Sequence, residues 1–196
     1  ESYTITDNWF NKNIEWSEIT PSIDAFASKT KKRLDFYWTE HTSAFKKSWK
    51  WQTLWLNPPF SKLTRVVEKI LHDEAEGILI IPVWPSKTWF PPLSSIAVKW
   101  WDLPREKPIY QDEKGNLLPP KPWETRVVVF NAFGALDRLD NGSSWYMQKP
   151  KNKILSISSI ELFRQQEFPT LDFPDNIHHI DECSKTHQKT QQTLLN

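Results

Sequence analysis

The sequence predicts an α/β fold in which a mostly parallel central sheet is flanked by helices. Continuous apolar segments, typical of strands covered on both faces, alternate with a strongly amphipathic helical segment. Proline- and polar-rich turns separate these segments at short intervals. Small or polar residues follow two of the predicted strands, which is where ligands bind in open α/β sheets.

The predicted elements follow an N-terminal lead-in, residues 1–19, whose short amphipathic helix can be capped by Thr6 or Asp7. In order, we expect a strand at 21–28, a basic helical stretch at 29–33, strands at 34–38 and 51–56, a helix at 63–76, a strand at 77–83, a short helix within 84–97, and strands at 96–101 and 125–130.

The helix at 63–76 has the clearest pattern, because its apolar residues recur at helical spacing on one face. These residues are Leu63, Val66, Val67, Ile70 and Leu71. The apolar run at 77–83 predicts a strand buried on both faces. Residues 110–122 carry turn chemistry, with a predicted tip at 113–116.

We therefore divide the chain into the lead-in at 1–19, a main domain at 20–148 and a C-terminal extension at 149–196. The last part of the extension is rich in Gln, Asp, His and Lys, and we expect it to be partly disordered or a linker.

Composition excludes several classes of protein. With only four glycines in 196 residues, the chain holds neither a P-loop nor a complete dinucleotide-binding glycine fingerprint. The single cysteine, Cys183, favours a reducing, intracellular compartment, cytoplasmic or nuclear. No apolar run approaches the roughly 20 residues that span a bilayer. The chain does not begin with Met, so we expect it to be a piece of a longer protein.

The most informative motif is Asn57-Pro58-Pro59-Phe60, which joins a predicted strand to the helix at 63–76. The Asn57 side chain offers a carbonyl acceptor to an amino group. The prolines stiffen the turn, and the Pro58 carbonyl is a second acceptor. Phe60 offers a ring face to a planar group. This combination suits chemistry on the exocyclic amine of a nucleobase.

A simpler interpretation is that Asn-Pro-Pro ends a strand and Phe60 plugs the core. Asp24 and Asn57 both stand at the carboxyl ends of predicted strands, so we expect them at one edge of the sheet.

The order of motifs resembles the phage-type Dam-like DNA adenine N6-methyltransferases, and more closely the methyltransferase-like domain of DIRS-type, tyrosine-recombinase retrotransposons. The resemblance covers roughly residues 3–134. Its motifs are the lead-in at 4–10, Ser22 to Ser28, Trp55 to Phe60, the apolar run at 78–82 with Trp84, Trp89 and Phe90, and Arg126 to Phe130.

This resemblance implies a Rossmann-like class I fold that uses S-adenosylmethionine as cofactor. Asn57 and the Pro58 carbonyl would bond the adenine N6 amine, with Pro59 holding the turn and Phe60 stacking on the flipped base. No metal is needed.

The resemblance also implies a cofactor loop from Asp24 to Ser28. Its expected ligands are Asp24, Phe26, Ala27 and Ser28. Many enzymes that use this cofactor carry glycines in this loop, where this chain has Ala27 and Ser28. Ser43 stands where the family tends to have an acidic residue, and Glu40 is the substitute we expect to accept the ribose hydroxyls.

Cations interleaved with aromatic residues at 29–51 suit phosphate contacts and base stacking. The residues expected to bind nucleic acid are Lys31, Lys32, Arg33, Lys46 and Lys47, together with Trp84. The alternative is a solvated lysine face over core aromatics. For Trp89 we favour a core position.

Two weaker patterns are also present. His178, His179, Cys183 and His187 loosely resemble a metal site, without a Cys-x-x-Cys partner. Gly134 could belong to the cofactor loop if the domain were circularly permuted, although the Asp24 segment fits the unpermuted order better.

Two functions follow from the sequence. One is a DNA adenine N6-methyltransferase domain of a retroelement polyprotein, which the intact Asn57–Phe60 motif favours. The other is a catalytically degenerate module that binds nucleic acid or docks onto a reverse transcriptase and ribonuclease H assembly. The glycine-free loop and Ser43 favour this second function.

Overall fold

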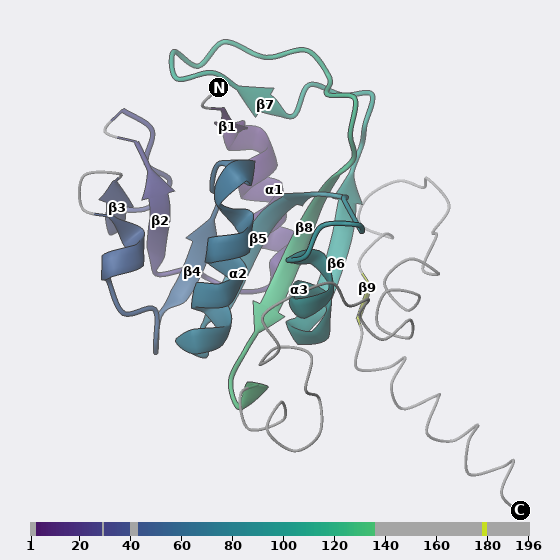
Figure 1. The fold of residues 1–196 in the computed structure, drawn as a ribbon. Helices are drawn as coiled ribbons and strands as arrows, with labels where there is room; N and C mark the ends of the chain where they lie inside the picture. The colour runs from purple at the N-terminus through teal and green to yellow at the C-terminus, as the bar shows by residue number, and fades with distance from the viewer. Residues whose placement is uncertain (1–2, 29, 40–42, 136–177, 180–196) are drawn as a thin grey trace, which may run out of the picture.

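A computed structural model of the chain describes residues 3–28, 30–39, 43–135 and 178–179 (Figure 1). Its elements are β1 (Thr4–Ile5), α1 (Asp7–Ser17), β2 (Ile23–Ala27), β3 (Tyr37–Thr39), the 3-10 turn η1 (Ala44–Lys46), β4 (Thr53–Leu56), the 3-10 turn η2 (Phe60–Lys62), α2 (Leu63–His72), β5 (Glu76–Pro82), α3 (Phe90–Ile96), β6 (Ala97–Leu103), β7 (Tyr110–Gln111), β8 (Thr125–Asn131) and β9 (His178–His179).

The main sheet confirms the predicted α/β class. Its strand order is β3-β2-β4-β5-β8-β6-β9. The β3–β2, β2–β4 and β4–β5 pairs are parallel, whereas β8 runs antiparallel to both β5 and β6. Strands β3, β2, β4, β5 and β6 therefore point in one direction, and β8 and β9 in the other. The sheet is mostly parallel, with a reversed strand inserted between β5 and β6.

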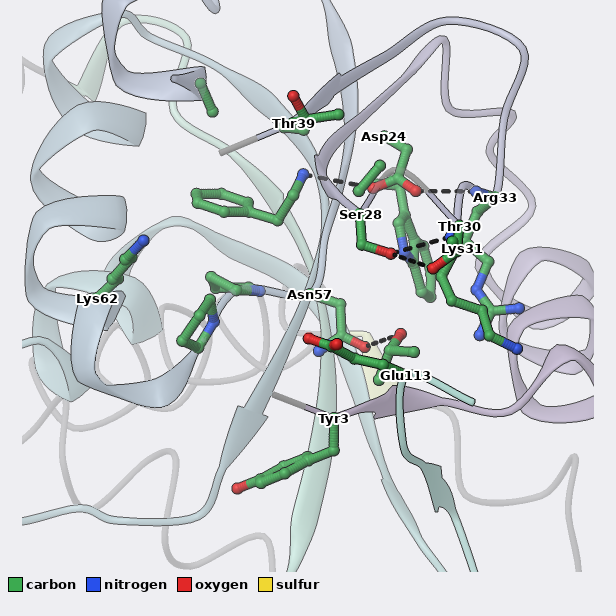
Figure 2. A pocket seen from close by; sticks show the side chains of 18 of the residues that line it. Tyr3, Asp24, Ser28, Thr30, Lys31, Arg33, Thr39, Asn57, Lys62 and Glu113 are labelled. Carbon is green, nitrogen blue, oxygen red and sulfur yellow. Dashed lines mark hydrogen bonds between the residues drawn. The ribbon is translucent and has the colours of Figure 1, made fainter. Parts of the chain in front are cut away.

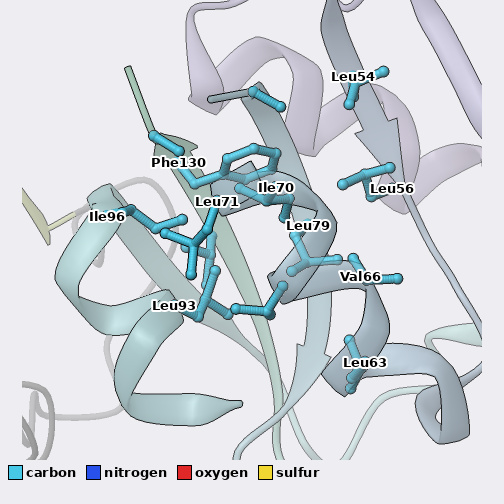
Figure 3. Close-up of a cluster of buried hydrophobic side chains, with 14 of the residues drawn as sticks. Leu54, Leu56, Leu63, Val66, Ile70, Leu71, Leu79, Leu93, Ile96 and Phe130 are labelled. Atoms are coloured by element: carbon cyan, nitrogen blue, oxygen red, sulfur yellow. The ribbon is translucent and has the colours of Figure 1, made fainter. Parts of the chain in front are cut away.

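Helices cover both faces of this sheet (Figure 1). Helices α2 and α3 pack on one face against strand residues such as Leu54, Leu79 and Val128 (Figure 3). Helix α1 packs on the other face against residues such as Trp55 and Ile78. Neighbours along each strand face opposite sides, and both sides are apolar. The two buried layers hold the carboxyl ends of β2 and β4 in a fixed position.

The predicted cap of the first helix is confirmed. Thr6 precedes α1 in an extended conformation, and its hydroxyl accepts a hydrogen bond from the Trp9 N–H at 3.4 Å. The lead-in is built into the fold, because Asn13 Oδ1 accepts a 2.9 Å hydrogen bond from Trp101 Nε1 of β6. The N-terminal residues are thus anchored against the sheet.

One predicted helical stretch and one predicted helix end are wrong. Residues 30–33 are not helical, because the Arg33 N–H is drawn to the Asp24 carboxylate and Ser28 closes a turn with Lys31. Helix α2 ends at His72 rather than at residue 76. The chain turns there through Glu74, whose φ is +52°, and β5 begins at Glu76.

A second, two-stranded sheet lies across the carboxyl ends of the parallel strands (Figure 1). In it, β1 pairs with β7, with Ile5 opposite Tyr110. The hairpin that contains β7 has the predicted tip, since Asp112 and Asn116 close it through backbone hydrogen bonds. Within the described residues, no helix is long and apolar enough to cross a membrane.

Candidate active site

A cavity of about 530 Å³ opens at the carboxyl ends of β2 and β4 (Figure 2). Its volume is within the range of small-molecule sites. The wall combines β2 and the loop after it, the corner after β4, the strand β1 and the tip of the β7 hairpin. Asp24 and Asn57 both line it, so the structure brings together the two segments that the sequence placed at one sheet edge.

The corner that begins at Asn57 directly follows β4, and the side chain of Asn57 is half-buried. Its Oδ1 accepts a 3.0 Å hydrogen bond from the Ile5 N–H and a 3.1 Å bond from the Thr4 hydroxyl. A carbonyl oxygen has two lone pairs. Both acceptor sites of Asn57 are therefore occupied by β1.

The two prolines give the corner one stiff conformation, because their rings fix φ. Pro58 is buried, and Pro59 is exposed. The Pro59 carbonyl accepts the Lys62 N–H at 2.9 Å and starts η2. No donor among the described residues bonds the Pro58 carbonyl. Pro58 itself lines the cavity.

Phe60 lies between the cavity and a group of aromatic side chains. Its ring lines the cavity and meets four other rings edge-on. These are Tyr3 at 5.8 Å, Trp84 at 5.7 Å, Trp123 at 6.0 Å and Tyr110 at 6.4 Å between ring centroids. Edge-on neighbours fix the plane of the ring. Phe60 is therefore held as a rigid aromatic wall.

Asp24 is the second residue of β2 and not its last, so its predicted place at the strand end is corrected. Its carboxylate is 4% exposed and accepts the backbone N–H groups of Arg33 at 2.9 Å and Phe26 at 3.4 Å. Burial raises the pKa of Asp24 to about 6, against the opposing effect of these two hydrogen bonds.

The rest of the predicted cofactor loop also lines the cavity. Phe26 is half-buried, Ala27 is buried, and the Ser28 hydroxyl accepts the Lys31 N–H at 2.9 Å. Ser43 lines the same cavity. Glu40, the predicted ribose acceptor, lies outside the described residues.

The residues predicted to bind nucleic acid differ in their surroundings. Lys31 lines the cavity, Lys32 lies 4.9 Å from the Tyr37 ring centroid, and Lys46 and Lys47 are exposed outside the cavity wall.

The Arg33 side chain makes hydrogen bonds within the fold. Its guanidinium bonds the Asp7 carboxylate and the Ile5 carbonyl, and burial lowers its pKa. Its role is to tie β1 and the start of α1 to the loop after β2.

Two parts of the site have no local signal in the sequence. Thr4 belongs to β1 and Tyr3 directly precedes it, and this strand is too short for a strand pattern. Asp112 and Glu113 reach the cavity from the hairpin tip, a position set by long-range pairing between β1 and β7. Only the turn chemistry of the hairpin could have drawn attention to that tip.

The other patterns have simpler outcomes. Trp89 is 5% exposed in the core, as expected. Gly134 follows β8, and its N–H bonds Glu74 at the opposite end of the sheet, which contradicts a cofactor loop there. Cys183 and His187 lie outside the described residues, which contain no cluster of potential metal ligands.

Comparison with protein families supports the resemblance seen in the sequence. The model of the family DNA N-6-adenine-methyltransferase (Dam) matches residues 7–103. The matched region runs from the start of α1 to the end of β6 and includes β2, β4 and the Asn57–Phe60 corner. No curated protein and no solved structure matches the chain.

Proposed function

We propose that this chain transfers a methyl group from S-adenosylmethionine to the N6 amine of adenine in DNA, on a Rossmann-like class I methyltransferase fold. One observation carries the proposal. The Asn57–Phe60 corner lines the same cavity as the segment from Asp24 to Ser28, which is the end of β2 and the first residue after it, so a target amine and a cofactor can meet there. The match of residues 7–103 to the Dam family supports this chemistry.

The cavity residues fit the cofactor in size and character. Small side chains at Ala25 and Ala27 leave room beside β2, and Asp24 supplies a buried carboxylate. Asp24, Phe26, Ala27 and Ser28 would hold S-adenosylmethionine, with Glu40 as the proposed ribose acceptor. When bound, the cofactor supplies an electrophilic methyl group on a sulfonium. The protein needs only to position the amine and to exclude water.

The corner residues orient the target amine. An amino group has two hydrogens, and the Pro58 carbonyl and Asn57 Oδ1 would each accept one. The base must leave the duplex to reach them, and Phe60 would then stack on its ring. Because the Thr4 hydroxyl bonds Asn57 Oδ1, the amine must replace that hydroxyl while Ile5 keeps its hydrogen bond.

We also propose that the domain works within a DIRS-type retroelement polyprotein, next to reverse transcriptase and ribonuclease H. The order of the sequence motifs supports this context. A specific observation favours the second candidate function, a non-catalytic module that binds nucleic acid or docks within the same assembly. Two groups of β1, the Thr4 hydroxyl and the Ile5 N–H, already donate hydrogen bonds to Asn57 Oδ1.

Calorimetric titration with S-adenosylhomocysteine separates the two functions. If the chain is an enzyme, S-adenosylhomocysteine should bind with micromolar or tighter affinity and raise the melting temperature. If the chain is a docking module, millimolar S-adenosylhomocysteine should give no heat of binding and no shift in melting temperature. The second result would overturn the proposal.

A further inference from the structure

A surface of cations and indole rings adjoins the proposed active site. We define it by Trp84, Lys87, Lys121 and Trp123. The two indole centroids are 6.1 Å apart. Lys87 Nζ lies 5.8 Å from the Trp84 centroid, and Lys121 Nζ lies 5.9 Å from the Trp123 centroid. Lys87 is exposed and the other three residues are half-buried, so a ligand can reach the surface from solvent.

Phe60 connects this cation–indole surface to the cavity. Its ring contacts both Trp84 and Trp123 edge-on. Among the described residues, the cavity wall includes Phe60 but neither indole. Phe60 therefore adjoins both the cavity and this surface. A polymer with one unit in the cavity would extend its neighbouring units over this surface.

The basic segment at 29–51 is a weaker candidate for the same contact. Arg33 is bonded to Asp7 and Ile5, and Lys32 lies over Tyr37 beside the edge strand β3. Neither Lys46 nor Lys47 lines the cavity. Lys31 lines the cavity, but it packs against Gly115 at the hairpin tip. A Cβ added at Gly115 would lie only 2.9 Å from Lys31 Nζ.

We propose that DNA flanking the target adenine binds the cation–indole surface. Lys87 and Lys121 contact its phosphates, and the two indoles stack on unpaired bases next to the flipped nucleotide. Ammonium groups beside aromatic faces are the chemistry that recognises a stretch of unpaired nucleic acid. The orientation of this DNA rests on the proposed function, because that function places the adenine at Phe60.

The test measures how the affinity of the full chain for DNA depends on salt. Fluorescence anisotropy of a labelled duplex that has unpaired bases beside a central adenine gives the slope of log Kobs against log salt between about 50 and 200 mM. The variant carries Lys87→Gln and Lys121→Gln. The matched control carries Lys12→Gln and Lys107→Gln, an equal loss of charge on one half-buried and one exposed lysine outside the cavity wall.

Each phosphate contact contributes about 0.9 to the slope, so the Lys87/Lys121 variant should have a slope shallower by about 2. The Lys12/Lys107 control should keep the slope of the unaltered chain. Equal slopes in the unaltered chain and the Lys87/Lys121 variant would overturn the proposal. So would an equal change in the control, or no DNA binding by the unaltered chain.

Titration of both variants with S-adenosylhomocysteine separates this surface from the proposed function. If the slopes differ as predicted but neither the unaltered chain nor the variants bind S-adenosylhomocysteine, the proposed DNA surface is supported and the proposed enzymatic function is refuted. If S-adenosylhomocysteine binds and DNA is methylated, but the Lys87/Lys121 variant keeps the slope of the unaltered chain, the enzymatic function is supported and the proposed surface is refuted.

Discussion

Replacing Thr4 with Val tests whether β1 competes with the target base. Valine has nearly the shape of threonine and suits a strand, but it cannot donate to Asn57 Oδ1. The variant should therefore leave the Ile5 hydrogen bond in place and free one lone pair of Asn57. In the proposed mechanism this lone pair accepts the adenine amine.

The size of the effect follows from one hydrogen bond. The Thr4–Asn57 bond is a 3.1 Å contact between neutral groups and is partly buried. Such a bond contributes about 1 kcal/mol net, which corresponds to about a fivefold change in an equilibrium. Because adenine no longer displaces the hydroxyl, kcat/KM for DNA should rise about fivefold. The loss of the bond should cost the folded state about 1 kcal/mol or less.

The assay is transfer of a labelled methyl group from S-adenosylmethionine to duplex DNA, with Thr4→Ser as the matched control. Serine keeps the hydroxyl, so this control should have the kcat/KM of the unaltered chain. A tenfold or larger loss of kcat/KM in Thr4→Val, with unchanged affinity for S-adenosylhomocysteine, would refute the reasoning. The hydroxyl would then help to position Asn57 for catalysis.

Three further changes test separate parts of the account. Asn57→Ala should abolish methyl transfer and, by leaving the Ile5 N–H without this acceptor, lower the free energy of unfolding by about 1–3 kcal/mol in urea denaturation; methylation at the original rate would contradict the assignment. The pKa of Asp24 rises from 3.8 to about 6 on folding, so the folded chain binds a proton that the unfolded chain releases. The free energy of unfolding should therefore fall by about 3 kcal/mol, relative to Asp24→Asn, as the pH rises from 3.8 to about 6. If the free energy of unfolding of the two chains has the same pH dependence, this reasoning is wrong. Gly77→Ala would place a Cβ 2.1 Å from the Leu54 carbonyl oxygen at a φ of +152°, and should cost about 2–4 kcal/mol in thermal or urea unfolding; an unchanged melting temperature would disprove that close approach.

Local patterns predicted most of the fold. The apolar face that begins at Leu63 and the run from 77 to 83 became α2 and β5, because each pattern matches the period of its element. The reversal of β8 between β5 and β6 was not predictable in this way. An apolar strand buried on both faces has the same pattern in either direction.

The candidate site was predicted in part for the same reason. Asn57 and Asp24 both line the cavity, as expected from the clear patterns of their strands, but Asp24 lies inside β2 and not at its end. The contacts of Thr4 with Asn57, and of Arg33 with Asp7, join residues far apart in the chain. Nothing local in the sequence specifies such contacts. Arg33 was therefore grouped with surface cations, although it anchors β1 and α1.

The central claim is that the Asn57–Phe60 corner presents adenine for methylation. Duplex DNA incubated with the chain and S-adenosylmethionine should be digested to nucleosides and analysed by mass spectrometry. We predict N6-methyl-2′-deoxyadenosine with the unaltered chain and none with Asn57→Ala. A chain that binds S-adenosylhomocysteine but forms no N6-methyl-2′-deoxyadenosine, or a variant that forms as much as the unaltered chain, would contradict the claim.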